Sequence, residues 1–167
     1  MKKIKIVGAL LFFVIFLATV GLEIVQWYNF KMKCGDYLKI TGDAPNIYLA
    51  DEYLKKAIYY LERTGKTKGN SAYFIKTPKN DLEIWYKQLK GAEETLGKLI
   101  QAENNGEQIP QLIKDNALMK IREVVIDVGR SGTEVTHPNH IHIFPYQLLF
   151  LIIEVISLIG AVTLLGV

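Results

Sequence analysis

The sequence predicts an all-α protein in which two terminal transmembrane helices flank a three- to four-helix extracytoplasmic bundle. Two observations lead to this fold class. The chain has 167 residues, 50% of them hydrophobic, and its apolar residues are concentrated in one long run near each end. Between the runs, apolar residues recur at the three- and four-residue steps of amphipathic helices.

The two apolar runs are each long enough to cross a membrane. They cover residues 4–25 (IKIVGALLFFVIFLATVGLEIV) and 144–167 (FPYQLLFLIIEVISLIGAVTLLGV). A helix needs about 20 apolar residues to cross a hydrocarbon core of ~30 Å. Aromatic residues, which gather where a membrane meets water, flank both runs: Trp27, Tyr28 and Phe30 after the first, Phe144 and Tyr146 in the second. We therefore expect transmembrane helices at 6–28 and 144–167.

The lysines around the first run indicate an orientation. Lys2, Lys3 and Lys5 precede the run and predict a cytoplasmic N-terminus at residues 1–5, although Lys31 and Lys33 beyond the run partly offset this signal. Residues 29–143 would then form a domain outside the cytoplasm. A cleaved signal peptide is the alternative, but the apolar stretch is longer than a typical signal core, which favours a retained anchor.

The domain at 29–143 is predicted to hold three helices and an extension of the first transmembrane helix as far as Thr41. Each helix is predicted from a stripe of apolar residues on one of its sides. The first stripe follows Asn46, and its helix ends at Gly65, a residue suited to a left-handed helix end. The second is a heptad seam that begins after a cap at Asn80, and the third runs from Pro110 to Gly129. The stripes comprise Ile47, Ala50, Leu54, Ile58 and Leu61; Leu82, Trp85, Leu89, Ala92, Leu96 and Leu99; and Ile113, Ala117, Ile121 and Val124, the last widened by Leu118 and Val125.

The seam needs an apolar partner, either the neighbouring helices of one bundle or a second chain in a coiled coil. We expect Trp85 to belong to the hydrophobic core.

Two stretches read as non-helical. Residues 66–78 form a polar turn whose insert at 72–75 would be a short strand or a plug over the bundle. Residues 130–145 read as an extended connector.

Three stretches carry a resemblance to a group of small bacterial membrane proteins of unknown function. They are CGDYLK (34–39), KTPKNDLEIWYKQLKGA (76–92) and TEVTHPNHIHIFP (133–145). The resemblance implies a helical domain between two terminal membrane helices, and it implies no activity. Together with the orientation that the lysines indicate, it predicts a location in a bacterial cytoplasmic membrane, with the main domain on the extracytoplasmic side.

All three histidines, His137, His140 and His142, lie within six positions, directly before the second apolar run. Three imidazoles and a water can hold zinc. Histidine also titrates near neutral pH, so a pH sensor is a further possibility. Because no second ligand cluster accompanies the three, we favour a polar connector at headgroup level. We expect no cofactor, with zinc or another transition metal as the alternative.

Glu154 is the most unusual residue of the second run. It lies nine residues past Pro145, or about 13 Å along a helix, and a charged carboxylate at that depth costs roughly 2.5 kcal/mol or more. It must therefore be neutral, paired or facing protein. Small residues that let another helix approach share its side: Ser157, Gly160 and Ala161. Pairing Tyr28 with Phe144 would bring Thr19 level with Glu154, close enough for a hydrogen bond.

Cys34, the only cysteine, is expected to be a partly buried thiol, with a disulfide between two chains as the alternative. The charges of the middle domain are nearly balanced, which argues against a nucleic-acid partner. No recognisable nucleophile, base and orienting group occur together, so we expect no enzyme.

The sequence thus favours an accessory subunit or scaffold, acting in an oligomer or a membrane-protein complex. The alternative is a metal- or pH-sensing membrane protein that uses the three histidines.

Overall fold

The computed structural model describes residues 2–129 and 132–166, with side chains at 3–127 and 134–166. Met1, Arg130, Ser131 and Val167, which fall in the predicted N-terminal segment, connector and second apolar run, lie outside the described residues. The described chain is mostly helical and divides into two compact units. We call Met1–Asn29 with His142–Val167 the two-helix unit, and Phe30–Ile141 the helical unit.

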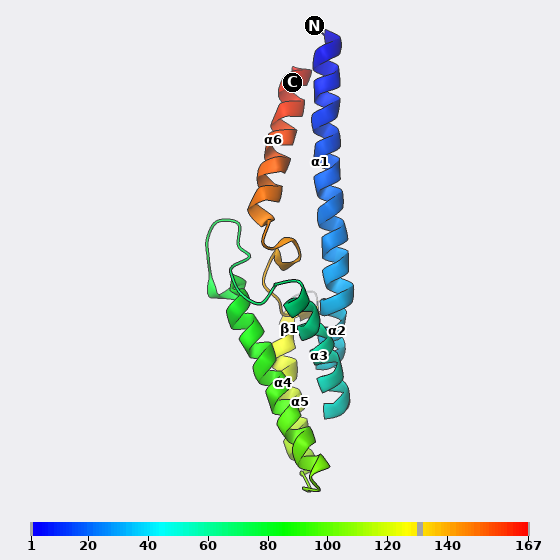
Figure 1. Ribbon diagram of the computed structural model, residues 1–167, viewed down its shortest axis with the longest axis vertical. Coiled ribbons are helices and arrows are strands. Elements are labelled where there is room, and N and C mark those ends of the chain that lie inside the picture. The colour runs from blue at the N-terminus through cyan, green and yellow to red at the C-terminus, as the bar shows by residue number, and fades with distance from the viewer. Residues whose placement is uncertain (1, 130–131, 167) are drawn as a thin grey trace. The chain divides into compact units, whose positions relative to one another are not determined.

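The two-helix unit is built from α1 (Lys2–Phe30) and α6 (Gln147–Leu165), which run antiparallel (Figure 1). Both helices are long and apolar enough to cross a membrane, as the sequence predicts. Only 11% of the most apolar window of each helix is buried. A core helix of a soluble domain would instead bury most of its apolar side chains.

The first helix continues beyond its apolar part, as predicted. After α1 the backbone forms a π-helical segment, η1 (Lys31–Gly35), and then α2 (Asp36–Gly42). The helical backbone is uninterrupted from Lys3 to Gly42. Within η1, Cys34 is completely buried, so the prediction of a partly buried thiol understated its burial.

The core of the helical unit is formed by α3 (Ile47–Arg63), α4 (Leu82–Asn104) and α5 (Gln111–Val125), packed with η1 and α2. All five predicted α3 positions are buried. The heptad seam of α4 is buried within this unit except at Leu99, which is partly exposed. Asn46 caps α3 by accepting from Leu49 N at 2.9 Å, and Gly65 ends this region with φ 68°.

Two details of these helices differ from the prediction. Asp81, rather than Asn80, caps α4, because its Oδ1 accepts from Glu83 N at 2.9 Å and from Ile84 N at 3.1 Å. The buried stripe of α5 is Ala117, Ile121 and Val125, whereas Ile113 is 48% exposed. Val125 belongs to the widened part of the predicted stripe, whereas Leu118 and Val124 are only partly buried.

The predicted connector contains a β-hairpin, so the unit is not purely helical. Strand β1 (Ile126–Gly129) pairs antiparallel with β2 (Gly132–Val135), and Ile126 lies opposite Val135. Helix α5 therefore ends at Val125 instead of Gly129. Trp85, which is buried as predicted, donates from Nε1 to the carbonyl oxygen of Thr136 at 2.9 Å and holds the end of the hairpin against α4.

The loop between α3 and α4 contains neither the predicted strand nor the predicted plug. Its apolar tip points outward, with Phe74 77% and Ile75 78% exposed. The loop closes through a single bridge, Asn70 to Asp81, before the short helix η2 (Pro78–Asn80) leads into α4. A second short helix, η3 (Ile141–Ile143), follows the hairpin.

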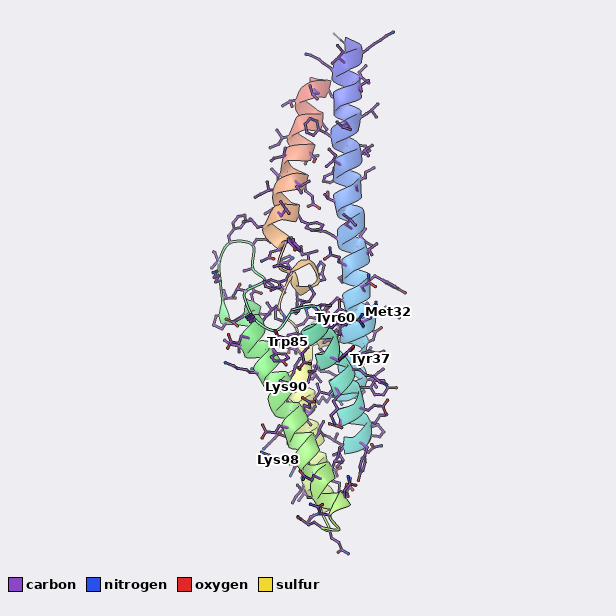
Figure 2. The ribbon with its side chains drawn as sticks, viewed as in Figure 1. Met32, Tyr37, Tyr60, Trp85, Lys90 and Lys98 are labelled. Carbon is purple, nitrogen blue, oxygen red and sulfur yellow. The ribbon has the colours of Figure 1, made fainter. Side chains whose placement is uncertain are left out.

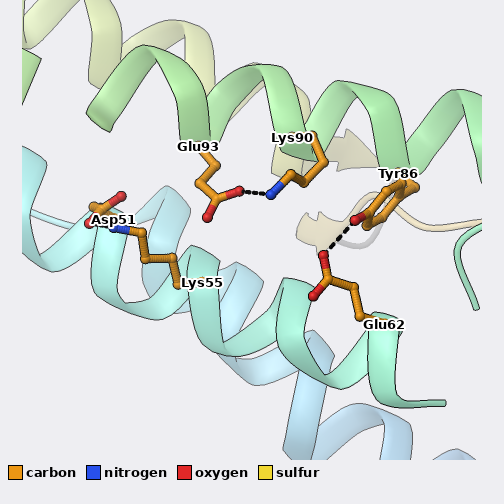
Figure 3. A network of polar contacts seen from close by, with 6 residues as sticks. All are labelled: Asp51, Lys55, Glu62, Tyr86, Lys90 and Glu93. Carbon is orange, nitrogen blue, oxygen red and sulfur yellow. Dashed lines mark hydrogen bonds and ion pairs between the residues drawn. The ribbon is translucent and has the colours of Figure 1, made fainter. Parts of the chain in front are cut away.

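Polar side chains also join α3 to α4 (Figure 3). Tyr86 donates its hydroxyl hydrogen to Glu62 Oε1 at 2.6 Å, while Lys90 pairs with Glu93 along α4. Burial and the bond to the Glu62 carboxylate raise the pKa of Tyr86 to about 12. Asp51 is buried on α3 and pairs with Lys55 at 2.6 Å.

Candidate functional site

The packing of α6 against α1 defines the site, and two glycines set its register. A Cβ on Gly160 would lie 2.9 Å from the ring of Phe12, and a Cβ on Gly8 would lie 2.9 Å from Leu164 Cδ1. Both contacts belong to the register that pairs Tyr28 with Phe144, the pairing considered from the sequence. A side chain at either position would force the Phe12 ring or the Leu164 side chain to shift, or the two helices to separate.

The small residues of the predicted site all face into this helix pair. Ser157 is 2% exposed and Ala161 8% exposed, and both share the α6 face of Gly160. On α1, Thr19 is 9% exposed, but its hydroxyl donates to carbonyl oxygens of its own helix, to Phe16 at 2.8 Å and Ile15 at 3.2 Å. The structure thus brings these residues together, and the hydroxyl of Thr19 bonds to α1 rather than to Glu154.

The electrostatic neighbour of Glu154 is Glu23, a residue to which the sequence argument gave no role. The two carboxyls lie close enough to interact, so they repel each other when both are ionised. Each has one oxygen, Oε1, that is buried and has no hydrogen-bond partner in the described residues. Each of these oxygens can therefore accept a further hydrogen bond.

Side-chain direction explains why Glu23 and Glu154 meet although the register places Glu154 level with Ala18. Side chains on a helix lean toward its N-terminus. In an antiparallel pair, Glu154 leans toward the Gln147 end of α6, and Glu23 leans away from Phe30 toward the same level. The sequence did contain this signal, because Glu23 lies little more than one turn beyond Ala18.

The three histidines do not form a ligand group. The ring of His137 packs edge-on against Phe30, with centroids 5.2 Å apart, and its Nδ1 lies 3.0 Å from the carbonyl oxygen of Pro138. The ring of His140 lies 4.2 Å from that of Tyr73. Nowhere in the described residues do three His, Cys, Asp or Glu side chains come close enough together to hold a metal ion. Burial lowers the pKa of His140.

A second polar group is buried inside the helical unit. Lys66 is 5% exposed and lies near the completely buried thiol of Cys34. Burial lowers the pKa of Lys66 to about 8 and raises that of Cys34. The hydroxyl of Tyr60 belongs to the same surroundings, and burial raises its pKa as well. Lys66 and Cys34 bear on the stability of the unit, in which both are buried.

In chemical terms, the site on α1 and α6 is a hydrogen-bonding position on an apolar surface. A protonated carboxyl can donate and accept hydrogen bonds, and an ionised one can accept them and pair with a cation. Comparison with known proteins adds no assignment, since no protein-family model, curated protein sequence or solved structure matches this chain.

Proposed function

We propose that this protein is a non-enzymatic subunit or scaffold of a bacterial cytoplasmic-membrane complex. In this proposal α1 and α6 cross the bilayer, and the helical unit lies on the extracytoplasmic side. A partner membrane protein, or a second copy of the chain, binds beside Glu154 and Glu23. The helical unit offers a further docking surface outside the membrane.

The observation that carries the proposal is the pair of buried, unpartnered carboxyl oxygens on two apolar helices. Acidic residues are rare in membrane helices and face protein when they occur. The small residues beside them are already used in packing α6 against α1. Glu23 and Glu154 are partly exposed as residues, so a small rotation of either side chain would present its carboxyl to a partner.

The type of partner follows from the chemistry of the pair. A membrane helix with an arginine, lysine, asparagine or serine at the matching depth would donate a hydrogen bond to Glu154 or Glu23. The apolar side chains around them would supply the packing: Ile152 is 46%, Val155 46% and Leu158 53% exposed. Two helices alone enclose no transport path, so a transport role would need such a partner.

Affinity purification in a mild detergent tests the proposal. The full chain should co-purify with a second membrane protein, or as an oligomer, and Glu154→Leu should reduce that association at least tenfold. Glu154→Gln should retain part of it, because the amide still hydrogen-bonds.

Thr163→Leu is the matched control. Thr163 is an exposed polar residue of the same helix, and its hydroxyl bonds only to α6 carbonyl oxygens, so its loss should change nothing. An association that survives Glu154→Leu unchanged would remove the membrane half of the proposal.

A further inference from the structure

The chain enters and leaves the helical unit at the same end, as the contact between Phe30 and His137 indicates. Phe30 opens the unit, and His137 lies four residues before its last residue, Ile141. Their rings pack with centroids 5.2 Å apart, and the ring of Tyr60 lies 6.2 Å from that of Phe30. We call this region the Phe30 end. The chain passes between the two units at this end, at residues 29–30 and 141–142.

A hollow of about 650 Å³ opens beside the Phe30 end, between η1, α2 and α3. Figure 2 labels two of its residues, Tyr37 on α2 and Tyr60 on α3. All its charged residues are cations, and its lining consists of Lys33, Tyr37, Lys56, Tyr59, Tyr60, Arg63 and Thr64.

The cations of this hollow are only partly neutralised. Lys56 pairs with Glu52 at 2.6 Å, and its Nζ lies 4.4 Å from the centre of the Tyr53 ring. Among the described residues, neither Lys33 nor Arg63 has an ion-pair partner. An ammonium and a guanidinium beside tyrosine hydroxyls suit the charge and the acceptor oxygens of a phosphate group.

The loop tip at Phe74 and Ile75 is a second, independent feature of this end. Outside α1 and α6, these are the two most exposed large apolar side chains of the described residues, at 77% and 78%. Lys68 and Lys76 flank the tip and are exposed. The neighbouring Tyr73 packs against His140, with ring centroids 4.2 Å apart, which ties the loop to the segment where the chain leaves the unit.

We propose that the Phe30 end binds the surface of an anionic membrane. A lipid phosphate occupies the hollow between Lys33 and Arg63, and the side chains of Phe74 and Ile75 insert among the lipids. Basic residues close to a membrane helix are drawn to anionic headgroups, and apolar side chains flanked by lysine are suited to the interface. This inference rests on the membrane location in the proposed function and is independent of the partner at Glu154.

Spin labels in nanodiscs test the insertion. In a Cys34→Ala background, single cysteines at Phe74, at Leu112 and at Val14 would each carry a nitroxide on the full chain. Leu112 is the exposed control on α5 (70%), and Val14 is the control inside α1 (59%). For each nitroxide, the collision rate with oxygen, which partitions into lipid, is then compared with the collision rate with a water-soluble nickel chelate.

We expect the label at Phe74 to show an oxygen-to-nickel ratio several-fold above that at Leu112, in nanodiscs that contain phosphatidylglycerol. A ratio equal to that at Leu112, while Val14 reports lipid, would overturn this inference and leave the membrane location intact. A water-like ratio at Val14 would overturn the membrane location itself.

Native mass spectrometry tests the hollow. The double variant Lys33→Gln/Arg63→Gln should retain several-fold less phosphatidylglycerol than the wild-type chain. Lys87→Gln/Lys98→Gln, which removes two exposed lysines of α4, is the charge-matched control and should retain as much as wild type. Equal retention in both double variants would overturn the site. Displacement of the lipid by millimolar inorganic phosphate would identify a free anion as the ligand and overturn the lipid assignment.

Discussion

Trp85 Nε1 donates a hydrogen bond to the carbonyl oxygen of Thr136 across 51 positions of sequence, at 2.9 Å. The bond fixes the end of the β-hairpin to the heptad seam of α4. It also satisfies a buried indole N–H, which would otherwise cost stability. The helical unit therefore depends on one residue for both packing and a long-range polar contact.

Replacing Trp85 by phenylalanine tests this dependence. The change leaves the Thr136 carbonyl without its donor and removes part of the packed ring, so we expect a loss of about 1–3 kcal/mol in the free energy of unfolding. Urea denaturation of the full chain in nanodiscs, followed by circular dichroism, measures it. Ile84→Ala, a half-exposed neighbour on α4, should cost much less; an equal cost for both changes would contradict the role of Trp85.

The contact between Tyr86 and Glu62 should stabilise α4 against α3. Tyr86→Phe removes the hydroxyl that donates to Glu62 at 2.6 Å. Because Glu62 is exposed to solvent, we expect the loss to be about 0.5–1.5 kcal/mol. Tyr59→Phe is the matched control, since Tyr59 is 61% exposed on α3, and its variant should unfold at the wild-type urea concentration.

Gly160 and Gly21 form a second matched pair, in the two-helix unit. A side chain on Gly160 meets the Phe12 ring, whereas one on Gly21 meets nothing within 4 Å. Gly160→Leu should therefore drive α6 away from α1, and Gly21→Leu should leave the pair intact. Distances between spin labels on the two helices, measured in nanodiscs, would show a shift for the first variant alone. Equal behaviour of the two variants would contradict this packing.

The buried Lys66 predicts a pH dependence of stability. Its pKa is about 8 in the folded chain and near 10.5 when unfolded, so above pH 8 the folded state loses the proton while the unfolded state keeps it. The unfolded state then binds more protons, and the free energy of unfolding rises with pH, by roughly 1 kcal/mol between pH 7 and 9. The raised pKa of Cys34 acts in the opposite direction as the pH rises through about 9, where the unfolded thiol loses its proton and the folded one keeps it.

Lys66→Met should abolish that rise, because no proton remains to be released. Urea denaturation at pH 7 and pH 9 compares the wild-type chain with the variant. Lys68→Met, which alters an exposed lysine of the same loop, should retain the wild-type dependence. A wild-type stability that is flat or falling from pH 7 to 8.5 would contradict the burial of a charged Lys66.

Periodicity predicted the helices well, because burial on a helix follows a regular step. The α3 stripe and the α4 seam were recovered in this way, whereas the extension to Thr41 was predicted from the absence of proline between Phe30 and Ile40. Periodicity did not predict the hairpin at Ile126–Val135, whose short strands depend on pairing with each other. Nor did it predict the burial of Asp51 and Lys66, which is decided by tertiary contacts that no local pattern records.

The candidate site was predicted in part. Spacing alone placed Ser157, Gly160 and Ala161 on one face, and the structure turns that face toward α1. Glu23 was missed because depth was compared at the backbone, without the lean of the side chains. The three histidines were grouped by sequence distance, but the chain turns at His140, whose φ is 56°, and separate aromatic rings hold His137 and His140.

The central claim is that Glu154 holds a protein partner within the membrane. A photo-crosslinking amino acid at Leu158, one turn from Glu154 and 53% exposed, tests it directly in living cells. We predict a discrete protein adduct, either with another membrane protein or at twice the mass of the chain, that disappears when Glu154→Leu is added. Adducts with lipid only, or a protein adduct of equal yield with Glu154→Leu, would contradict the claim.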